Sequence, residues 1–396
     1  MIPFQDALHL VLQHQKDFGT EKVSLLESTG RILANNVLAD RDFPPYNRVM
    51  MDGIAINASA FNTGVRTFTI EKIQPAGTPQ QMLDNSSNCI EIMTGAVLPA
   101  NTDVVIPYEQ CEITEGAATT KVEQVSAMQN VHTQGTDSKK GELLIEKWKR
   151  ITPAMIGIMA SAGLSQVEVF RLPKVTICST GDELVDVSEQ PLAHQVRRSN
   201  VYMLAAALLS EGIHADTIHL ADNPKLLTAE IGHLINNNEV ILFSGAVSKG
   251  KFDYLPSVFD QLGMELIFHT IAQRPGKPVL FGKFSNGTLI FGFPGNPVST
   301  FVCYHQFFKR WLNECLKYKC QKVFAALAED VNFKPALAYH LLVQIKNDNG
   351  IILVTPVTGS TSGDVVTLTK AEGVITLPAE RDYFKEGEVF EVNIVS

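Results

Sequence analysis

Apolar residues near the start of the chain recur at the spacing of one helix face. Phe4, Leu8 and Val11 follow this spacing, which predicts an amphipathic N-terminal helix. A second helix is predicted over 152–163, where Thr-Pro opens the segment and glycine ends it. We expect the residues around this second helix to pack back on the N-terminal one, so that the two segments form one discontinuous helical domain.

Two other stretches show the short alternation of apolar and polar residues that is typical of β-strands. Residues 46–136 are rich in Gly, Thr and Val, with alternating runs at 68–70 and 104–106. The tail over 319–396 alternates Val, Ile, Thr and Gly in the same way. We predict a small β unit inserted into the helical domain and a second small, barrel-like β unit at the C-terminal end.

Between these units the pattern changes to strands that alternate with helices. Asn223-Pro224, for example, separates an apolar run from a helical repeat, and Gly212 ends the helix before that run. Strands joined by helices form a mostly parallel sheet that is covered on both faces. The predicted fold is therefore multidomain α/β plus β, with domain I at 1–45 and 137–172, domain II at 46–136, domain III at 173–318 and domain IV at 319–396.

The composition excludes several classes of protein. Of the 396 residues, 45% are hydrophobic and 19% are charged, which is typical of packed cores and not of a disordered chain. A net charge of −9 argues against a nucleic-acid-binding protein, because such proteins present a basic face. No apolar run approaches the ~18 residues of a membrane span, and the N-terminus lacks the basic region of a secretory signal. Six cysteines without a CxxC pair indicate reduced thiols in the cytoplasm.

Ligands of an open α/β sheet bind beyond the carboxyl ends of its strands, and three loops of domain III are predicted there. The first is STGDE at 179–183, directly after a predicted strand. Its adjacent carboxylates, Asp182 and Glu183, suit Mg²⁺, which takes oxygen ligands from one or two carboxylates and a substrate phosphate. The alternative is a turn whose carboxylates cap the next element.

The second loop is SGAVSKGKFDY at 244–254, after the apolar run 240–243. Small residues let backbone N–H groups approach an anion closely, and the start of a helix follows. The GxxxxGK[ST] pattern of a nucleotide-binding P-loop is absent. The loop is predicted to bind phosphate, and the alternative is an ordinary glycine-rich turn between a strand and a helix.

The third region contains RPGKP at 274–278 and GFPGNPVS at 292–299. The stretch 266–313 around them has no Asp or Glu, although the chain as a whole is acidic. Its Lys and Arg residues therefore meet an oxyanion without a competing carboxylate nearby in sequence. Pro297 suits the first turn of a helix, whose free N–H groups are then expected to face the anion. The alternative is a pair of tight turns that join strands.

Together these loops resemble those of the molybdopterin molybdenumtransferase family, which includes the MoeA proteins and the E domain of gephyrin. The resemblance extends over essentially the whole chain. Its six ordered motifs are MDGIA at 51–55 for the family's MDGYA, MTGA at 93–96, STGDEL at 179–184, SGAVSKGKFDY at 244–254 for SGGVSxGxxDY, RPGKP at 274–278 for KPGKP, and GFPGNPVS at 292–299 for GLPGNPVS.

The resemblance implies a fold and a reaction. The central domain is expected to be a three-layer α/β sandwich of the molybdopterin-adenylyltransferase type, accompanied by an elongated helical domain that forms a dimer and by two small β domains. The implied reaction inserts molybdate into adenylylated molybdopterin, with Mg²⁺ as cofactor and AMP as a product. The protein is expected to be a cytoplasmic homodimer whose active site is shared between subunits, with an adenylyltransferase as a further partner.

The loops and the resemblance together assign the site residues. The expected catalytic residues are Asp52, Thr94, Asp137, Glu183, Ser248 and Asp253. Those expected to bind the pterin nucleotide or molybdate are Thr180, Gly181, Asp222, Ser244, Gly245, Arg274, Lys277, Pro278, Gly295, Asn296, Ser299, Ser360 and Ser362. The expected Mg²⁺ ligands are Glu183 and Asp253, helped by Asp182 or Asp222. By resemblance, Ser360 or Ser362 comes from domain IV of the partner subunit.

The sequence also departs from the family's pattern. Arg274 stands where the family has lysine, which exchanges a point charge for a planar fork. Ala246 replaces the second glycine of the SGG turn, and residues 46–50 differ from the family's FDNSA. An arginine that the family carries in domain IV is missing near His340. Either another residue takes over its role toward molybdate, or molybdate binds more weakly.

Two other functions stay open on the sequence alone. The central domain also resembles the adenylyltransferases that make the adenylylated intermediate, although the extra domains and the ordered motifs favour the molybdenumtransferase. The other is a receptor-clustering scaffold like gephyrin, which is expected to carry a preceding adenylyltransferase-like domain, whereas this chain begins at the E-domain boundary. Tungstate is an alternative substrate, because it has nearly the size and charge of molybdate.

Overall fold

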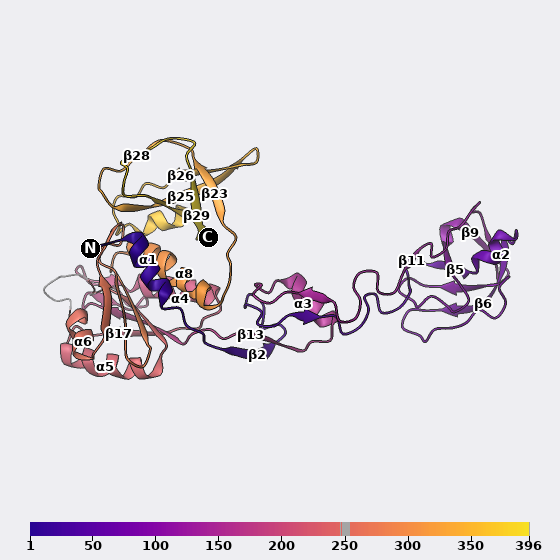
Figure 1. The fold of residues 1–396 in the computed structure, drawn as a ribbon, viewed down its shortest axis with the longest axis horizontal. Coiled ribbons are helices and arrows are strands. Elements are labelled where there is room, and N and C mark those ends of the chain that lie inside the picture. The colour runs from indigo at the N-terminus through magenta and orange to yellow at the C-terminus, as the bar shows by residue number, and fades with distance from the viewer. Residues whose placement is uncertain (246, 248–253, 396) are drawn as a thin grey trace.

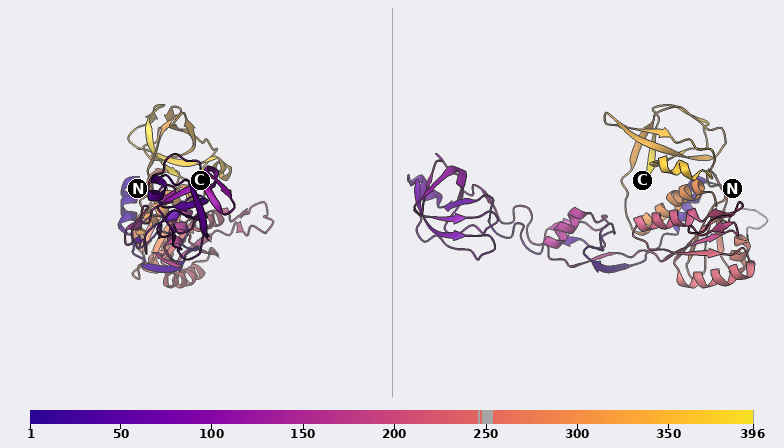
Figure 2. Two further views of the ribbon diagram at one scale, coloured as in Figure 1. Left: turned by 90° about the vertical axis from the view of Figure 1, so that its right-hand side faces the viewer. Right: turned by 180° about the vertical axis from the view of Figure 1, so that it is seen from behind.

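The computed structural model describes residues 1–245, 247 and 254–395, and the molecule is elongated (Figure 1). Domains III and IV form one body, which contains both ends of the described chain. The part of domain I that follows α1 (Phe4–Gln13) extends from this body as a narrow stem, and domain II lies at the far end of the stem (Figures 1 and 2). The length of domain I therefore separates domain II from domain III.

Domain III is built on a six-stranded sheet. The strand order is β17, β14, β18, β22, β21, β19, in which the first four strands run parallel and the last two pair antiparallel. Branched aliphatic and aromatic residues fill the central strands, as expected where both faces of a sheet are covered. In the order given, the strands are Asp216–Leu220, Val175–Thr180, Val240–Ser244, Leu289–Phe293, Leu280–Lys283 and Glu265–His269.

Helices cover both faces of this sheet, as predicted. Val240 and Leu242 of β18 pack on one side with α4 and the C-terminal helix, whereas Ile241 and Phe243 pack on the other side with α5 and α6. These helices are α4 (Ser199–Ser210), α5 (Pro224–Asn237), α6 (Leu255–Gln261) and a continuous C-terminal helix of α7 (Pro297–Cys303), a π-helical segment (Tyr304–Phe308) and α8 (Lys309–Cys315).

The predicted N-terminal helix exists as α1 (Phe4–Gln13), but its predicted packing partner is wrong. The apolar face of α1 packs on the C-terminal helix of domain III, and Trp311 donates a hydrogen bond to the carbonyl of His14 (2.9 Å). The second predicted helix is α3 (Pro153–Ser161), which Thr152 caps and which packs in a separate core. The reason is that periodicity defines an apolar face without defining what covers it.

Domain I is a mixed stem and not a helical domain, which corrects the expectation from the resemblance. Strand β2 pairs with β13, β3 pairs with β12, and α3 packs over them. In the order given, the strands are Thr20–Ser24, Gln166–Phe170, Val37–Leu38 and Leu143–Ile145. The domain is elongated, as expected, because short antiparallel pairs follow one another along its length (Figure 1).

Domain II is a β unit, as predicted. Its sheet has the order β8, β5, β7, β6, β10, β9. The strands are Val104–Pro107, Gly53–Ile56, Cys89–Ile92, Thr67–Gln74, Ala117–Thr120 and Cys111–Thr114, and short helices span α2 (Ala58–Asn62) and Tyr108–Gln110. The two-residue strands β4 (Arg48–Val49) and β11 (Val131–His132) pair where the chain enters and leaves this domain.

Domain IV is the second predicted β unit. Its main sheet has the order β1, β20, β25, β26, β23, β29, β27. Strand β20 (Ile271–Arg274) belongs to the sequence of domain III but pairs with β25, so it ties the two domains together. The other strands are Ile2–Pro3, Ala338–Asp348, Ile351–Pro356, Val323–Leu327, Val389–Ile394 and Gly373–Leu377, with the separate pair β24 (Val331–Asn332) and β28 (Tyr383–Phe384) and a 3₁₀ helix over Val365–Lys370.

Within the described residues, no helix has the length and apolar character needed to cross a bilayer. The six cysteines are all free thiols, as the sequence predicts. Cys178 and Cys303 are fully buried, and burial raises the pKa of both thiols well above the ordinary value. These two cysteines therefore act as small core residues.

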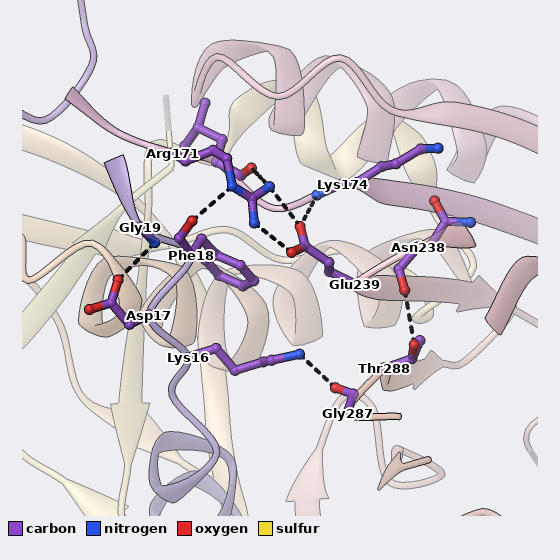
Figure 3. Close-up of polar contacts among 11 residues, drawn as sticks. Lys16, Asp17, Phe18, Gly19, Arg171, Lys174, Asn238, Glu239, Gly287 and Thr288 are labelled. Carbon is purple, nitrogen blue, oxygen red and sulfur yellow. Dashed lines mark hydrogen bonds and ion pairs between the residues drawn. The ribbon is translucent and has the colours of Figure 1, made fainter. Parts of the chain in front are cut away.

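One ion pair clamps both chain segments that connect domain I to domain III (Figure 3). Arg171 forms a bidentate pair with Glu239 (2.6 and 3.0 Å) and donates to the carbonyl of Phe18 (2.8 Å). The backbone N–H of Lys174 donates to the same carboxylate (2.8 Å). Because Glu239 directly precedes β18, the stem is fixed to the strand that leads into the second predicted loop.

A second ion pair joins domain I to domain III at Glu211, whose side chain is 7% exposed. Arg150 lies 2.9 Å and Lys309 3.1 Å from its carboxylate. Burial by itself raises the pKa of this group, but the charges of Lys309 and Arg150 outweigh it and lower the pKa below its ordinary value. The stabilisation is therefore present above the unfolded-state pKa and is lost as the pH falls through the lower folded-state pKa.

We expect Glu211→Gln to lower the free energy of unfolding at neutral pH by about 2 kcal/mol, because hydrogen bonds between charged groups are lost. The difference from wild type should shrink as the pH falls below the ordinary pKa of a glutamate and through the lower folded-state pKa of Glu211. Urea unfolding at several pH values measures both effects, with Glu314→Gln as control, since Glu314 is an exposed glutamate of α8, the helix that carries Lys309. A difference that does not change with pH contradicts the assignment.

Candidate active site

A cavity of about 660 Å³ opens at the carboxyl ends of β14, β18 and β22, and we call it the domain III cavity. Its walls come from the loops after these strands, the start of α4 and a loop of domain IV. Parts of all three predicted regions therefore meet at one place. The predicted site residues that line it are Thr180, Gly181, Glu183, Asp222, Ser244, Gly245, Gly295 and Asn296.

Neighbouring carboxylates lie at one side of the domain III cavity. Asp182 Oδ1 accepts a hydrogen bond from the N–H of Asp222 (3.4 Å), and Glu183 folds back over Gly181. Burial and the charges of Asp182 and Glu183 raise the pKa of Asp222. A hard cation relieves such repulsion, so the donor set suits Mg²⁺. In the described part of the chain, no three such groups converge on one point, and the further predicted ligand Asp253 lies outside it.

Three main-chain segments approach one another at the floor of the cavity. Gly245 has φ +100°, its N–H donates to the carbonyl of Phe293 (3.0 Å), and a Cβ there would lie 3.3 Å from the carbonyl of Thr180. A Cβ at Gly295 would lie 3.7 Å from Gly245 Cα. Glycine is needed at 245 because of both its backbone angle and this close approach. The rest of the second predicted loop, with Ala246, Ser248 and Asp253, lies outside the described residues.

Asn200, near the start of α4, lines the cavity although the sequence analysis does not single it out. Its Nδ2 lies within hydrogen-bonding distance of Ser244 Oγ (2.9 Å), the Gly295 carbonyl (2.7 Å) and Thr300 Oγ1 (3.3 Å). A carbonyl only accepts, so Gly295 fixes the orientation of the amide. One side chain therefore joins two of the predicted loops to the C-terminal helix. Its only sequence signal is a polar residue in the first turn of a helix.

A loop of domain IV closes one side of the cavity. Asn296 Nδ2 donates to Ser362 Oγ (2.8 Å), and the N–H of Val298 donates to the Ser362 carbonyl (3.1 Å). This second bond corrects the sequence prediction, since an N–H expected to face an anion is already occupied. Ser362 thus contacts the wall residue Asn296 from its own chain, whereas Ser360 bonds to Asp364 (3.2 Å), and neither serine is itself a wall residue. A contribution from a partner's domain IV stays a prediction.

The RPGKP segment of the third predicted region forms a basic edge beside the cavity, whereas the GFPGNPVS segment supplies Gly295, Asn296 and Pro297 to its walls. Arg274 and Lys277 are exposed, and the loop that carries them packs on α7 through Gly276, whose φ is +86°. A Cβ at Gly276 would lie 2.4 Å from Cys303 Sγ. Pro278 follows in this loop, and Ser299 is a buried residue of α7.

The position of the missing domain IV arginine lies beside this basic edge. Arg274 of β20 is in register with Tyr339 of β25. The next residue, His340, is buried and bonds to Gln273 Oε1 (3.2 Å) and Thr376 Oγ1 (3.0 Å), and burial lowers the pKa of His340 to about 3. His340 is therefore a neutral structural residue. Arg274 is a cation on β20, the strand that pairs with β25, where the family's arginine is missing.

Domain II holds a separate group of predicted residues. Asp52 Oδ1 accepts hydrogen bonds from the N–H (2.6 Å) and hydroxyl (2.7 Å) of Thr94, and the bond from the backbone N–H is the main cause that lowers the pKa of Asp52. Asp137, at the junction of domains I and II, pairs with His132 (2.9 Å). The backbone of Val49 bonds to the Thr94-containing turn and to β11, so these residues share one edge of domain II. The structure therefore divides the predicted site into two halves at opposite ends of the stem (Figure 1).

Three family models match the chain in succession. A model of the MoeA N-terminal region (domain I and II) matches residues 2–163, a probable molybdopterin binding domain matches 176–314, and a model of the MoeA C-terminal region (domain IV) matches 325–395. The domain III cavity lies within the second match. Fold and site together define an enzyme of molybdenum cofactor biosynthesis with a molybdopterin-binding α/β domain.

Similar proteins match over their full length. A molybdopterin molybdenumtransferase of Synechocystis is 37% identical over 98% of this chain and 99% of its own, and one of Haemophilus influenzae is 31% identical over 94% and 93%. The crystal structure of a molybdopterin biosynthesis MoeA protein from Pyrococcus horikoshii has a TM-score of 0.82 at 28% identity, with 100% of this chain and 99% of that chain covered. The chain belongs to the molybdopterin molybdenumtransferase (MoeA) family, and it is a transferase.

Proposed function

We propose that this enzyme inserts molybdate into adenylylated molybdopterin and releases AMP. The observation that carries the proposal is the domain III cavity, where carboxylates, closely approaching main-chain segments and hydroxyl groups surround a space large enough for a small ligand. The Synechocystis relative, which matches over nearly its whole length, is named molybdopterin molybdenumtransferase. This favours the proposed reaction over the adenylyltransferase or scaffold alternatives. Incubation with adenylylated molybdopterin, Mg²⁺ and molybdate, followed by measurement of AMP, tests it.

In the proposed mechanism, Glu183 and Asp253 would hold Mg²⁺, with Asp182 or Asp222 in support. Bound Mg²⁺ neutralises charge that develops on the phosphates as AMP leaves. Gly181 and Gly245 let the main chain approach the phosphates, while Ser244 and Asn296 present polar groups to the same cavity.

The bond that breaks is the phosphoanhydride, and AMP leaves with the bonding electron pair. An oxygen of water or of molybdate completes the terminal phosphate of molybdopterin, and Asp253 or Ser248 positions that oxygen. The dithiolene sulfurs then bind molybdenum in place of one oxygen, which leaves as water with the two thiol protons or, where molybdate supplied the attacking oxygen, stays on the phosphate. Arg274 and Lys277 hold the oxyanion at the basic edge, where Arg274 also stands in for the missing domain IV arginine.

We expect Lys277→Ala to raise the molybdate concentration for half-maximal activity by at least about 10-fold, because a charged hydrogen bond to an oxyanion contributes roughly 1.5–3 kcal/mol. Arg274→Lys, which restores the family's residue, should stay active. Lys283→Ala is the matched control, since this lysine pairs with Glu265 (3.2 Å) at the far edge of the sheet. If Lys277→Ala leaves the molybdate requirement unchanged, this loop does not bind the oxyanion. The same titration with tungstate measures the selectivity between molybdate and tungstate.

The proposed enzyme is a cytoplasmic homodimer. One chain holds Asp52, Thr94 and Asp137 at the far end of its stem, away from its own domain III cavity (Figure 1). A second copy related by twofold symmetry supplies the missing half of each site. In the same arrangement, Ser360 of the partner subunit contributes to the site. Light scattering at micromolar concentration should give twice the 43.5 kDa chain mass. An active 43.5 kDa monomer contradicts the shared site.

A further inference from the structure

A chain of hydrogen bonds ends on Asp137. Arg48 and His132 lie directly opposite each other in the short ladder of β4 and β11. Arg48 Nη2 is 3.2 Å from His132 Nδ1, and His132 Nε2 is 2.9 Å from Asp137 Oδ1. These three side chains come from the two chain segments that connect domain I to domain II. Arg48 also belongs to the segment 46–50 that departs from the family's pattern.

The chemistry of the outer group fixes the middle one. A guanidinium has no acceptor, so Arg48 must donate and His132 Nδ1 must accept. The imidazole then carries its hydrogen on Nε2, which donates to the carboxylate of Asp137. All the hydrogen bonds therefore point in one direction, from Arg48 through a neutral His132 to Asp137. This arrangement holds one carboxylate oxygen and leaves the other for a further partner.

The backbone of Asp137 is held by different contacts. Its N–H donates to the carbonyl of Phe43 (2.9 Å), and the adjoining turn is held by the bond from the N–H of Gln134 to Asn47 Oδ1 (2.9 Å). The side chains of His132 and Asp137 are 27% and 59% exposed, so their pair adds little to the stability of the fold. The Arg48–His132 chain therefore acts on the direction of the carboxylate and not on the path of the main chain.

A small cavity lies beside this carboxylate. It has a volume of about 250 Å³ and is lined by Arg41, Arg48, Asp137 and Ser161, among others. Asp42 faces the same turn, where it accepts from Gln134 Nε2 (3.0 Å). The fixed direction of Asp137 therefore matters at a concave surface that combines residues of domain I and the entrance of domain II.

We propose that Arg48 and His132 are positioning residues that aim the Asp137 carboxylate for the reaction. This inference rests on the proposed function, in which Asp137 belongs to the shared active site. His132 determines the direction of the carboxylate, and Arg48 determines the tautomer of His132. In this chain, a guanidinium and an imidazole from the domain II connection thus complete a site whose substrate lies in domain III of the partner.

The activity test compares variants that differ in one donor. His132→Phe keeps a planar ring but removes both nitrogens, and we expect turnover to fall about 10-fold with little change in the molybdate requirement, because a misdirected group impairs chemistry more than binding. His132→Gln keeps a donor near Nε2 and should restore most of the activity. Arg48→Leu should lower turnover less than His132→Phe does. Adding His132→Phe to Asp137→Asn should not lower turnover below that of Asp137→Asn alone.

Three outcomes separate this inference from the proposed function. If Asp137→Asn loses activity while His132→Phe keeps wild-type turnover, the positioning role is overturned and the proposed function stands. If Asp137→Asn keeps wild-type turnover, Asp137 leaves the proposed site and the positioning role falls with it. Wild-type enzyme that releases no AMP overturns the proposed function itself.

A spectroscopic test does not depend on activity. In ¹⁵N-histidine-labelled dimer near pH 8, the His132 ring, assigned by its disappearance in His132→Gln, should show the hydrogen on Nε2. Arg48→Leu should increase the share of the other tautomer. A wild-type ring with its hydrogen on Nδ1 overturns the inference, because Arg48 and that nitrogen would then both be donors.

Discussion

Replacement of Glu183 by glutamine should reduce AMP release by at least about 100-fold, the usual cost of removing one group that stabilises charge in a transition state. The side chain is exposed and lines the domain III cavity, so the variant should fold normally. Initial rates of AMP release at fixed Mg²⁺ measure the effect, and raised Mg²⁺ should recover part of the loss. Glu189→Gln, an exposed glutamate of the following loop outside the cavity walls, is the matched control.

A glycine beside Glu183 gives an independent check. Gly181 has φ +128°, and a Cβ there would lie 2.6 Å from Glu183 Oε2. Gly181→Ala should therefore displace the carboxylate and lower activity although the charge is kept. If both Glu183→Gln and Gly181→Ala retain wild-type rates at low Mg²⁺, the carboxylates of this loop have no part in the reaction.

Replacement of Gly276 by alanine should lower the free energy of unfolding by about 2–4 kcal/mol, since it combines overpacking with a strained backbone. The added Cβ would lie 2.4 Å from Cys303 Sγ and 3.0 Å from Gln273 Nε2, both in a buried core. The loop with Arg274 and Lys277 should move with it, so the molybdate requirement should rise as well. Denaturant unfolding and a molybdate titration measure the two effects.

The double variant Gly276→Ala with Cys303→Ala separates overlap from backbone strain. Without the sulfur atom, Gly276→Ala should lower the free energy of unfolding by less. The loss that persists is then due to the backbone strain at a φ of +86°. Equal costs in both backgrounds would show that the contact with Cys303 does not limit this loop.

The sequence was sufficient for features whose cause is local. Asn223 accepts hydrogen bonds from the first N–H groups of α5, and Pro224 occupies the first turn, as the Asn-Pro pair predicts. Gly212 has φ +82° just after α4, where a helix that stops in a left-handed residue needs glycine. Strand alternation with helices likewise predicts the domain III sheet, because each element's own periodicity shows whether one or both faces are covered.

Features that depend on contacts between distant residues were not accessible in this way. Nothing in the periodicity of α1 indicates that His14 accepts from Trp311 on the C-terminal helix. The occupied N–H of Val298 was missed for the same reason, since its partner Ser362 lies in another domain. Asn200 was missed because one polar residue in a helix carries no sign of the three groups that its amide contacts.

The position of the predicted residues around a cavity was partly accessible. The rule that ligands bind beyond the carboxyl ends of strands brings Glu183 and Ser244 together correctly. The same rule says nothing of Asp52 and Thr94, which lie on another domain, and their place in a shared site was predicted from the resemblance alone. Lys277 stayed outside the cavity walls because a carboxylate-free stretch indicates charge but not location.

The most direct test of the central claim is a single-turnover assay with the wild-type enzyme, Mg²⁺ and adenylylated molybdopterin, with and without molybdate. The proposed function predicts that AMP appears in step with molybdenum bound to the pterin, and that Glu183→Gln suppresses both products together. The claim that this cavity couples phosphoanhydride cleavage to metal insertion is contradicted if AMP is released at the same rate without molybdate. It is also contradicted if AMP is released and no molybdenum is bound to the pterin.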